Sequence, residues 1–231
     1  MCGRFALDTP STCVAEKFSL ADFPLLAPRY NIAPASDILV VRHRPEVGRV
    51  GQLVRWGLVP AWAKDPSIGA KLINARAETV ESKPSFRSSF ARHRCLIPAS
   101  GFYEWKVVSE NGKVRRQPYY VRPAEGDGLF AFAGLLARWR SGTGEDLVTA
   151  CIITTEANAL MAPIHDRMPA ILAPGAWDAW LGAENASTEK LKGLLGPVPA
   201  EGMTAYAVGM AVNRAGVEGK GLIKEVSEGM R

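Results

Sequence analysis

The pattern that most restricts the fold is a series of short segments rich in β-branched and aromatic residues, separated by turn residues. Seven of them are typical of β-strands: 37–44, 50–57, 94–99, 101–108, 118–122, 129–139 and 147–155. Two connections, ENGK at 110–113 and SGTGED at 141–146, are short and contain glycine, as hairpin turns do. Strands joined by short turns pair antiparallel, so we expect a mainly antiparallel sheet.

Helical signals are fewer than strand signals, and they cover 11–18, 86–92, 174–181 and 187–195. A length of 231 residues suits one large domain. The strands on both sides of PAEGDG (123–128), the best candidate for a boundary, fit one sheet system. We therefore predict a single α+β domain over 1–231, with a curved or barrel-like antiparallel sheet flanked by helices.

Cysteine usage and hydropathy exclude several classes of protein. The four cysteines form no CxxC pair and lie near no histidine at ligand spacing, so we expect no metal, no cofactor and no disulfide framework. Cys13, Cys95 and Cys151 stand in apolar surroundings and are expected to be buried in the core. No apolar run approaches the roughly 20 residues of a membrane helix, and no secretory signal is present, so we expect a cytoplasmic protein.

Charge is distributed unevenly along the chain. The net charge of +5 combines 19 Lys and Arg against 10 Asp and Glu in 1–122 with 9 against 13 in 123–231. A basic half of this kind favours a polyanionic partner such as nucleic acid, and a solvated basic surface would give the same pattern.

The first residues, MCGRF, place a small residue directly after Met1. Removal of Met1 would leave an amine and a thiol on neighbouring carbons of Cys2. The pKa of the amine would be about 8 and that of the thiol about 8.5. The amine can add to an aldehyde, and the adjacent thiolate can then close a thiazolidine ring at high effective concentration. The alternative is an arbitrary exposed cysteine.

Two further segments carry residues that suit catalysis or nucleic-acid binding. In LINARAETV (72–80), Asn74, Arg76 and Glu78 point to one side of an extended segment. Arg76 offers a planar fork for phosphate and Asn74 can orient a nucleophile, although an Arg76–Glu78 ion pair is an alternative. In WGLVPAWAK (56–64), Trp62 follows a Pro-Ala turn and could stack on a base, whereas Trp56 suits the core.

The segments PASGFYEWK and APIHDRMPAIL hold the candidate proton carriers. In the first, Phe102 and Glu104 share one face of a strand, and Tyr103 and Trp105 share the other. Partial burial would raise the pKa of Glu104 and suit it to acid–base work. In the second, His165 is the natural proton carrier, its neighbour Asp166 can fix the tautomer, and the following Arg167 can contact phosphate.

The motifs MCGRF, PRYNIAP, WGLVPAWAK, INARAET, KPSFR, RCLIPASGFYEW and IHDRMPAIL, in this order, resemble the SOS-response-associated peptidase (SRAP) family. The resemblance runs from residue 2 to about residue 226, although Gly221 stands where many members have Glu, so no contact is carried over for that loop. Members of this family crosslink to abasic sites in single-stranded DNA. The resemblance implies a sensor that shields the lesion through a thiazolidine on Cys2, formed by lyase-type imine chemistry after autoproteolytic removal of Met1.

The resemblance also implies roles for individual residues. Asn74 would hold the aminothiol, Glu104 would position the amine and assist proton transfer, and His165 would aid opening of the sugar ring. DNA contacts are implied for Arg4, Trp62, Arg76, Trp105 and Arg167. The implied partner is single-stranded DNA containing abasic sites, bound by a monomer without metal or cofactor, away from membranes and associated with the nucleoid.

Three other functions compete with this interpretation. A class II glutamine amidotransferase also begins MCG, but it requires an NGE-type strand that is missing here. A thiol peptidase could use Cys2, Glu104 and His165, at least on its own Met1 bond. A plain single-strand DNA-binding module would explain the arginines and tryptophans and leave those three residues without a task.

Overall fold

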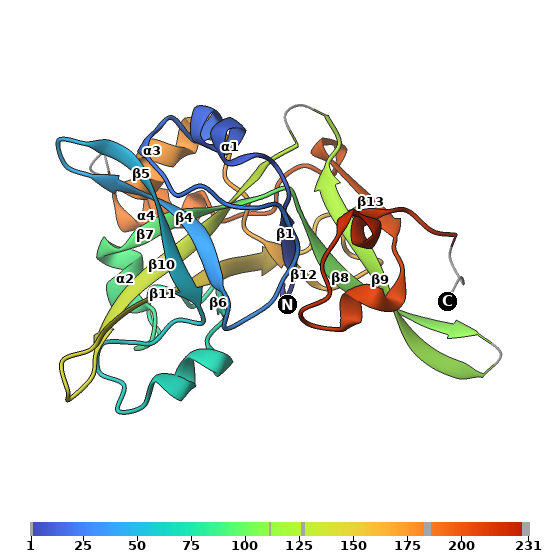
Figure 1. Ribbon diagram of the computed structural model, residues 1–231, viewed down its shortest axis with the longest axis horizontal. Helices are drawn as coiled ribbons and strands as arrows, with labels where there is room; N and C mark the ends of the chain where they lie inside the picture. Colours follow the sequence, from blue (N-terminus) through green and yellow to red (C-terminus); the bar gives the residue numbers. More distant parts are fainter. Residues whose placement is uncertain (1, 111, 126–127, 183–185, 228–231) are drawn as a thin grey trace.

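The strands of the computed structural model form two sheets that lie side by side (Figure 1). The structure describes residues 2–110, 112–125, 128–182 and 186–227. One sheet has eight strands and the other has five. The predicted α+β fold class, with a barrel-like and mainly antiparallel sheet, is confirmed.

Five strands of the larger sheet close into a barrel, because β11 pairs with β10 on one side and with β5 on the other. The order around the barrel is β5, β4, β7, β10 and β11, and each pair is antiparallel except β5 with β11. The barrel strands are β4 (Asp37–Arg44), β5 (Gly48–Trp56), β7 (Arg94–Ala99), β10 (Phe130–Arg140) and β11 (Asp146–Glu156). The short strands β2 (Leu20–Asp22), β6 (Asn74–Arg76) and β12 (Arg167–Pro169) lie beside them.

The barrel has two distinct ends. The β4–β5 and β10–β11 turns and the start of β7 lie together at one end, which we call the hairpin end, because Arg44 pairs with Gly48 and Arg140 pairs with Asp146. At the opposite end, the ring of Phe5 lies 5.3 Å from that of Trp56 and 6.1 Å from that of Phe132. We call this the Cys2 end, since Cys2 precedes Phe5 by three residues.

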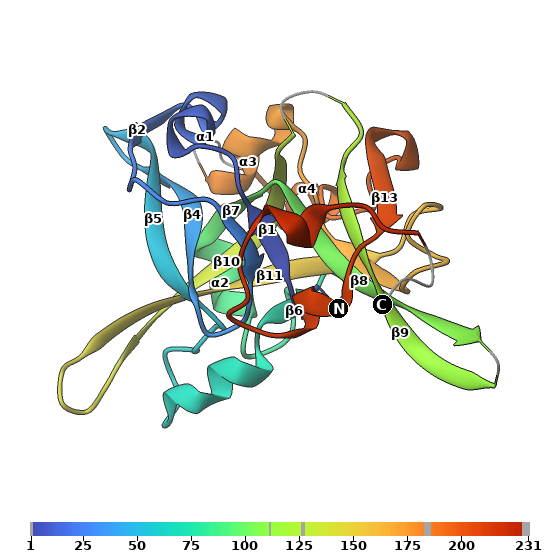
Figure 2. The same ribbon diagram turned by 45° about the vertical axis from the view of Figure 1, so that its right-hand side comes forward.

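The smaller sheet has the strand order β13, β9, β8, β1 and β3, and Figure 2 labels β1, β8, β9 and β13. Its strands are β1 (Phe5–Leu7), β3 (Arg29–Ile32), β8 (Gly101–Glu110), β9 (Lys113–Pro123) and β13 (Met203–Ala207). The chain passes from the barrel to this sheet at Ser100, and the next residue must be glycine, because a Cβ on Gly101 would lie 2.5 Å from the Tyr120 ring. The expectation of one sheet system around 123–128 is wrong, since β9 and β10 belong to different sheets.

Short helices cover the barrel, as the sequence predicts. They are α1 (Ser11–Phe18), α2 (Arg87–Arg92), α3 (Trp177–Leu181) and α4 (Thr188–Gly193). Helix α1 buries Ser11, Val14, Ala15 and Phe18, a stripe at helical spacing. Cys13 lies off this stripe and is exposed, so the expectation that it is buried is wrong, whereas Cys95 and Cys151 are confirmed as core residues.

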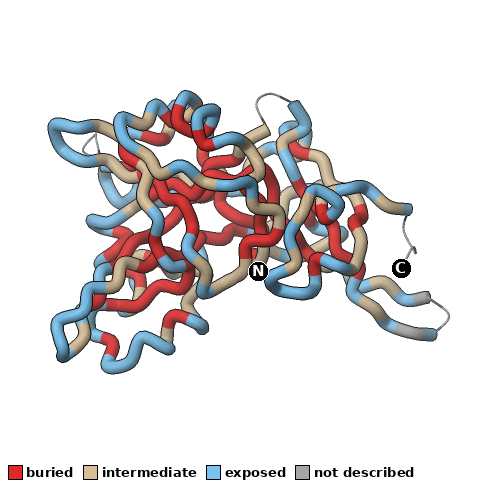
Figure 3. Tube along the Cα trace, in the orientation of Figure 1, coloured by how far each residue is buried: buried red, intermediate tan, exposed pale blue. Residues whose placement is uncertain are grey.

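The described residues form one large buried cluster, a smaller one, and a third that consists of Val59, Ala63 and Trp139; Figure 3 shows where the chain is buried. The large cluster fills the barrel and includes Cys2, Trp56 and Phe132, none of them more than 1% exposed. The smaller cluster lies on the far side of the five-stranded sheet, where Tyr103 packs against Val212 and Leu222 of the C-terminal segment. Strand β8 therefore has apolar contacts on both faces.

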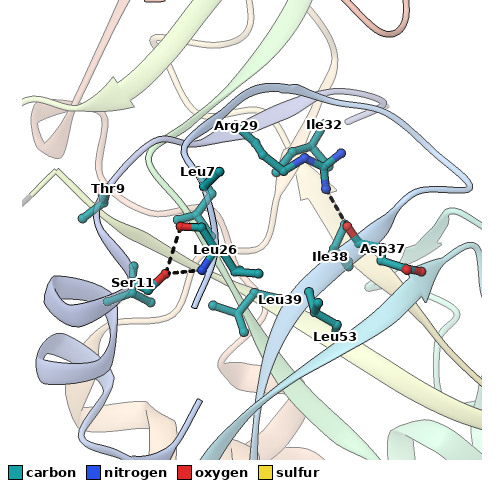
Figure 4. Close-up of a pocket in the computed structure, with 12 residues that line it drawn as sticks. Leu7, Thr9, Ser11, Leu26, Arg29, Ile32, Asp37, Ile38, Leu39 and Leu53 are labelled. Carbon is teal, nitrogen blue, oxygen red and sulfur yellow. Dashed lines mark hydrogen bonds between the residues drawn. The ribbon is translucent and has the colours of Figure 1, made fainter. Parts of the chain in front are cut away.

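A small cavity of about 140 Å³ lies between α1 and the barrel (Figure 4). Leu7, Ile38 and Leu39 line it, and the Ser11 hydroxyl closes one side by bonding both the N–H and the C=O of Leu26, at 2.8 and 3.2 Å. Its lining includes none of the candidate catalytic residues, so it is separate from the site described next.

Candidate functional site

Cys2 lies at the centre of the candidate site and is completely buried. The side-chain amide of Asn74 donates a hydrogen bond of 2.8 Å from Nδ2 to the Cys2 carbonyl oxygen. Asn74 is held in place by β6, where it pairs with Ile152 of the barrel. Residues 72 positions apart in the sequence are thus joined at the Cys2 end of the barrel. Met1 lies outside the described residues.

Glu104 comes to this site through the alternation of strand β8. Phe5 pairs with Phe102 across β1 and β8, so the side chain two residues later stands on the same face, toward the large core. Glu104 is only 2% exposed, and this burial raises the pKa of its carboxyl to about 7. Both protonation states are therefore populated at neutral pH.

The Cys2 thiol has an environment that opposes ionisation. Burial raises its pKa well above the ordinary value, and the neighbouring Glu104 carboxylate raises the pKa further. The thiol therefore stays protonated until a base removes its proton or the site rearranges. Glu104, whose charge acts on this thiol and whose pKa is near neutrality, has the properties of such a base.

His165 faces Glu104, with 3.9 Å between its Nε2 and Oε2 of the carboxyl. The backbone N–H of Arg167 donates to Nδ1 of the ring at 2.9 Å, and an amide nitrogen cannot accept in return. The neutral ring therefore carries its proton on Nε2, toward Glu104. Burial lowers the pKa of His165, which keeps the ring neutral at pH 7, while the exposed Asp166 carboxylate beside Nδ1 acts in the opposite direction.

The distance between Glu104 and His165 has a chemical consequence. At 3.9 Å the two atoms are too far apart for a direct hydrogen bond. A single oxygen atom placed between them would lie within hydrogen-bonding distance of both. The pair is thus arranged to exchange protons with an oxygen atom of a ligand or of a water molecule next to Cys2.

The five predicted DNA-contacting residues differ in how free their side chains are. Arg76 is exposed, and within the described residues its guanidinium makes no hydrogen bond or ion pair. Trp62 is 59% exposed, and its indole N–H makes one long contact of 3.5 Å with the Pro84 carbonyl. These two side chains are available to a ligand.

The other three predicted contacts already hold parts of the protein together. Arg4 Nη1 donates to Oδ1 of Asn31 at 2.5 Å and to the Val212 carbonyl at 2.7 Å. The Trp105 indole donates to Oδ1 of Asn213 at 2.7 Å. These bonds tie strands β1 and β8 to the C-terminal segment.

Arg167 makes a two-pronged ion pair with Glu78, at 2.5 and 3.0 Å, and donates to the Thr154 carbonyl at 2.6 Å. Glu78 therefore pairs with Arg167 and not with Arg76, the partner considered from the sequence. Through this pair, Glu78 anchors the segment whose backbone fixes the tautomer of His165.

Three residues of this region were not assigned by sequence reasoning. Asn31 is buried and donates from Nδ2 to the carbonyls of Arg214 and Val217, at 3.0 and 2.9 Å. The only sequence feature that could have indicated Asn31 is its position in the YNIAP motif. Nothing in the local pattern pointed to Asn213, and Glu78 was noted but given a different partner.

The described residues include no group of three or more His, Cys, Asp or Glu side chains placed to hold a metal ion. Among the same residues, no helix has both the length and the apolar character to cross a membrane.

Comparisons with known proteins are consistent across sequence and structure. The model of the family described as SOS response associated peptidase (SRAP) matches residues 1–215. The abasic site processing protein YoqW of Bacillus subtilis is 44% identical over 216 residues, which cover 92% of this chain and 94% of that protein. The abasic site processing protein YedK of Escherichia coli is 30% identical, over 98% of this chain and 100% of its own.

A eukaryotic relative and a solved structure extend these matches. The abasic site processing protein HMCES of Xenopus tropicalis is 33% identical over 81% of this chain and 63% of that protein. A crystal structure of a protein from Bacteroides thetaiotaomicron superposes with a TM-score of 0.83 at 26% identity, covering 98% of this chain and 100% of that one. The two chains therefore share one fold.

Proposed function

This chain belongs to the SOS response associated peptidase (SRAP) family, and from that membership we propose that it processes abasic sites in single-stranded DNA through a covalent bond to Cys2. The printed names of its relatives support abasic-site processing. The single observation that carries the covalent step is the convergence of Cys2, Glu104 and His165 at one end of the barrel.

The reaction begins with removal of Met1, which frees the α-amine of Cys2. The amine adds to the aldehyde of the ring-opened sugar, and the resulting carbinolamine loses water to give an imine. The Cys2 sulfur then bonds to the imine carbon, while the thiol proton passes to the nitrogen. The product is a five-membered thiazolidine, and one water molecule leaves in the overall reaction.

Glu104 and His165 supply the proton transfers that these steps require. With a pKa of about 7, Glu104 can take the thiol proton and can also protonate the departing hydroxyl of the carbinolamine. His165 presents its Nε2 proton toward the same space and would protonate the sugar ring oxygen as the ring opens. The Asn74 bond to the Cys2 carbonyl holds the nucleophile in place during both steps.

The same site would remove Met1 by hydrolysis of the Met1–Cys2 bond, with consumption of one water molecule. The Cys2 thiol stands next to this bond, and Glu104 is the base available to it. The purified Glu104→Gln variant should then retain Met1, whereas a matched exposed variant, Glu16→Gln, should lose it. Equal loss of Met1 from both variants would assign the cleavage to another protein.

DNA would approach over the exposed Arg76 and Trp62, which suit a phosphate and a base. Arg4, Trp105 and Arg167 would also contact the strand, the two arginines through the guanidinium N–H groups that their internal bonds leave available and Trp105 through the face of its ring. A flexible single strand can turn its sugar toward a buried cysteine more easily than a duplex can. We expect a monomeric protein in the cytoplasm that is associated with the nucleoid when it is bound to DNA.

A denaturing gel tests the proposed function. The protein is mixed with three single strands that differ at one position, which carries an abasic site, an abasic analogue without an aldehyde, or a normal nucleotide. A heat-stable shifted band should form with the first strand alone. A band of equal intensity with the analogue would contradict aldehyde chemistry, and a normal band from Cys2→Ser would contradict the role of sulfur.

A further inference from the structure

The hairpin end of the barrel contains a second cavity, of about 430 Å³, that the proposed reaction does not use. Strands β4, β5, β10 and β11 all contribute to its walls, together with α2 and the start of β7. Its residue Val148 stands four positions before Ile152, the partner of Asn74 on β11. Four strand residues span about 13 Å, so this cavity is distinct from the Cys2 site.

The cavity carries an excess of positive charge. Arginines contribute from four different places on its wall: Arg42, Arg92, Arg94 and Arg138. The one carboxylate in the lining, that of Asp146, is already paired with Arg138 and with Arg140. The pKa of His93 is lowered by burial and then by the positive charges of the neighbouring Arg92 and Arg94.

Two of the residues that line this cavity each carry a buried polar atom that makes no hydrogen bond with any residue that the structure describes. The two atoms are Nε of Arg42, a donor, and Oε1 of Gln52, an acceptor. The register Val40 with Gln52 and Arg42 with Val50 places both side chains on the same face of the β4–β5 pair. Buried polar groups are normally satisfied, so a ligand that offers both an acceptor and a donor would complete this pair.

The rest of the lining is apolar and includes Leu136, Val148 and Leu181. A cavity of this size, with a few convergent polar groups on apolar walls, has the character of a small-molecule site. Arginine forks recognise phosphate oxygens, while the apolar wall suits a sugar or a base.

We propose that the hairpin end of the barrel is a binding site for a phosphate-bearing ligand of nucleotide size. The Arg42 and Arg92 side chains bind the phosphoryl group, and Gln52 accepts a hydrogen bond from a hydroxyl or amino group of the ligand. The phosphate can belong to a free mononucleotide or to the 5′ end of a DNA strand. The site does not depend on the chemistry of Cys2.

Isothermal titration calorimetry on the full chain tests this site and separates the two sources. The probes are inorganic phosphate, deoxyadenosine monophosphate, and an oligonucleotide without abasic sites, with and without a 5′-phosphate. Saturable binding of the mononucleotide identifies a metabolite site. Tighter binding of the 5′-phosphorylated strand than of the same strand without this phosphate identifies a DNA end, because the Cys2 end would contact both strands equally.

The variants assign the binding to this cavity. Arg42→Gln should weaken binding about tenfold or more, since it removes a charged hydrogen-bond donor. The control Arg55→Gln, an exposed arginine at the Cys2 end, should stay within about twofold of wild type. If circular dichroism shows that Arg42→Gln does not fold, Arg92→Gln on the surface of α2 replaces it.

Absence of saturable heat with phosphate and with the mononucleotide, together with equal affinities for the two oligonucleotides, would overturn the proposal. Equal losses in Arg42→Gln and Arg55→Gln, or unchanged affinity in Arg42→Gln, would do the same, because they indicate nonspecific attraction to a basic protein. The crosslink yield of Arg42→Gln with abasic DNA should match that of wild type, so this result and the outcome for Cys2 can be read independently.

Discussion

The substitution Glu104→Gln should stabilise the protein at alkaline pH while it slows the reaction. Glu104 is 2% exposed, and burial raises its pKa from 4.5 to about 7. A raised carboxyl pKa means that the folded state prefers the protonated form. The stability that accompanies protonation is therefore fully present below pH 4.5 and is lost as the pH rises through 7.

The size of this effect follows from the same two values. At about 1.4 kcal/mol per pH unit, raising the pKa from 4.5 to about 7 costs the folded state about 3 kcal/mol once the carboxyl is ionised. Glutamine has nearly the same shape and stays neutral. The variant should therefore match wild type near pH 4.5 and exceed it by up to about 3 kcal/mol at pH 8.5.

Urea unfolding followed by tryptophan fluorescence measures this difference at both pH values. Glu16→Gln, an exposed substitution on α1, is the control and should show no pH-dependent difference from wild type. When Met1 has been removed from both proteins before the assay, the crosslinking rate of Glu104→Gln should fall by about 100-fold or more, the usual contribution of a general acid or base. A stability difference independent of pH would refute the buried, titrating carboxyl, and an unchanged rate would refute its catalytic role.

Three further predictions concern neighbouring residues. Asn74→Ala removes the bond to the Cys2 carbonyl and should slow crosslinking about fivefold, as measured in single-turnover kinetics; an unchanged rate would mean that the bond does not position Cys2. Arg76→Gln should reduce the dependence of DNA affinity on salt by about one phosphate contact, measured by fluorescence anisotropy over a salt series. Glu78→Gln weakens the anchor of Arg167 and should slow crosslinking, as measured in the same single-turnover assay; an unchanged rate would mean that the ion pair does not position the segment of His165.

The local pattern of apolar residues was sufficient to predict the long strands and most of the helices. The predicted strands 37–44 and 94–99 and the helix 11–18 coincide with β4, β7 and α1, because their apolar residues repeat at the period of the element. Strands β1, β3 and β13 have only three to five residues, too few to show a period. These three strands can be identified only from their pairing with segments that are distant in the sequence.

The closure of the barrel and the second sheet could not be predicted from the sequence. Strands β5 and β11 meet in parallel with about 100 residues between them, and no local signal marks such a pair. The transfer of the chain between sheets at Gly101 depends on a contact with Tyr120, which is also a tertiary feature. The long strands were therefore predicted correctly, whereas the short strands were missed and the expectation of a single sheet was wrong.

The residue types in the sequence identified the candidate site better than they identified the hydrogen bonds and ion pairs within it. The strand alternation predicted that Glu104 shares a face with Phe102, and the structure confirms its burial. The ion pair of Arg167 with Glu78 and the bonds of Arg4 to Asn31 and Val212 arise only when segments far apart in the chain meet. The functional roles of these residues remain predictions for the experiments above.

Intact mass spectrometry tests the covalent role of Cys2 most directly. The purified protein should lack Met1, and after mixing with a single strand that carries one abasic site it should gain the mass of that strand less one water molecule. Cys2→Ser should give no such heat-stable adduct. Retention of Met1 without an adduct, or an adduct of the same mass and stability from Cys2→Ser, would contradict the thiazolidine chemistry proposed for this site.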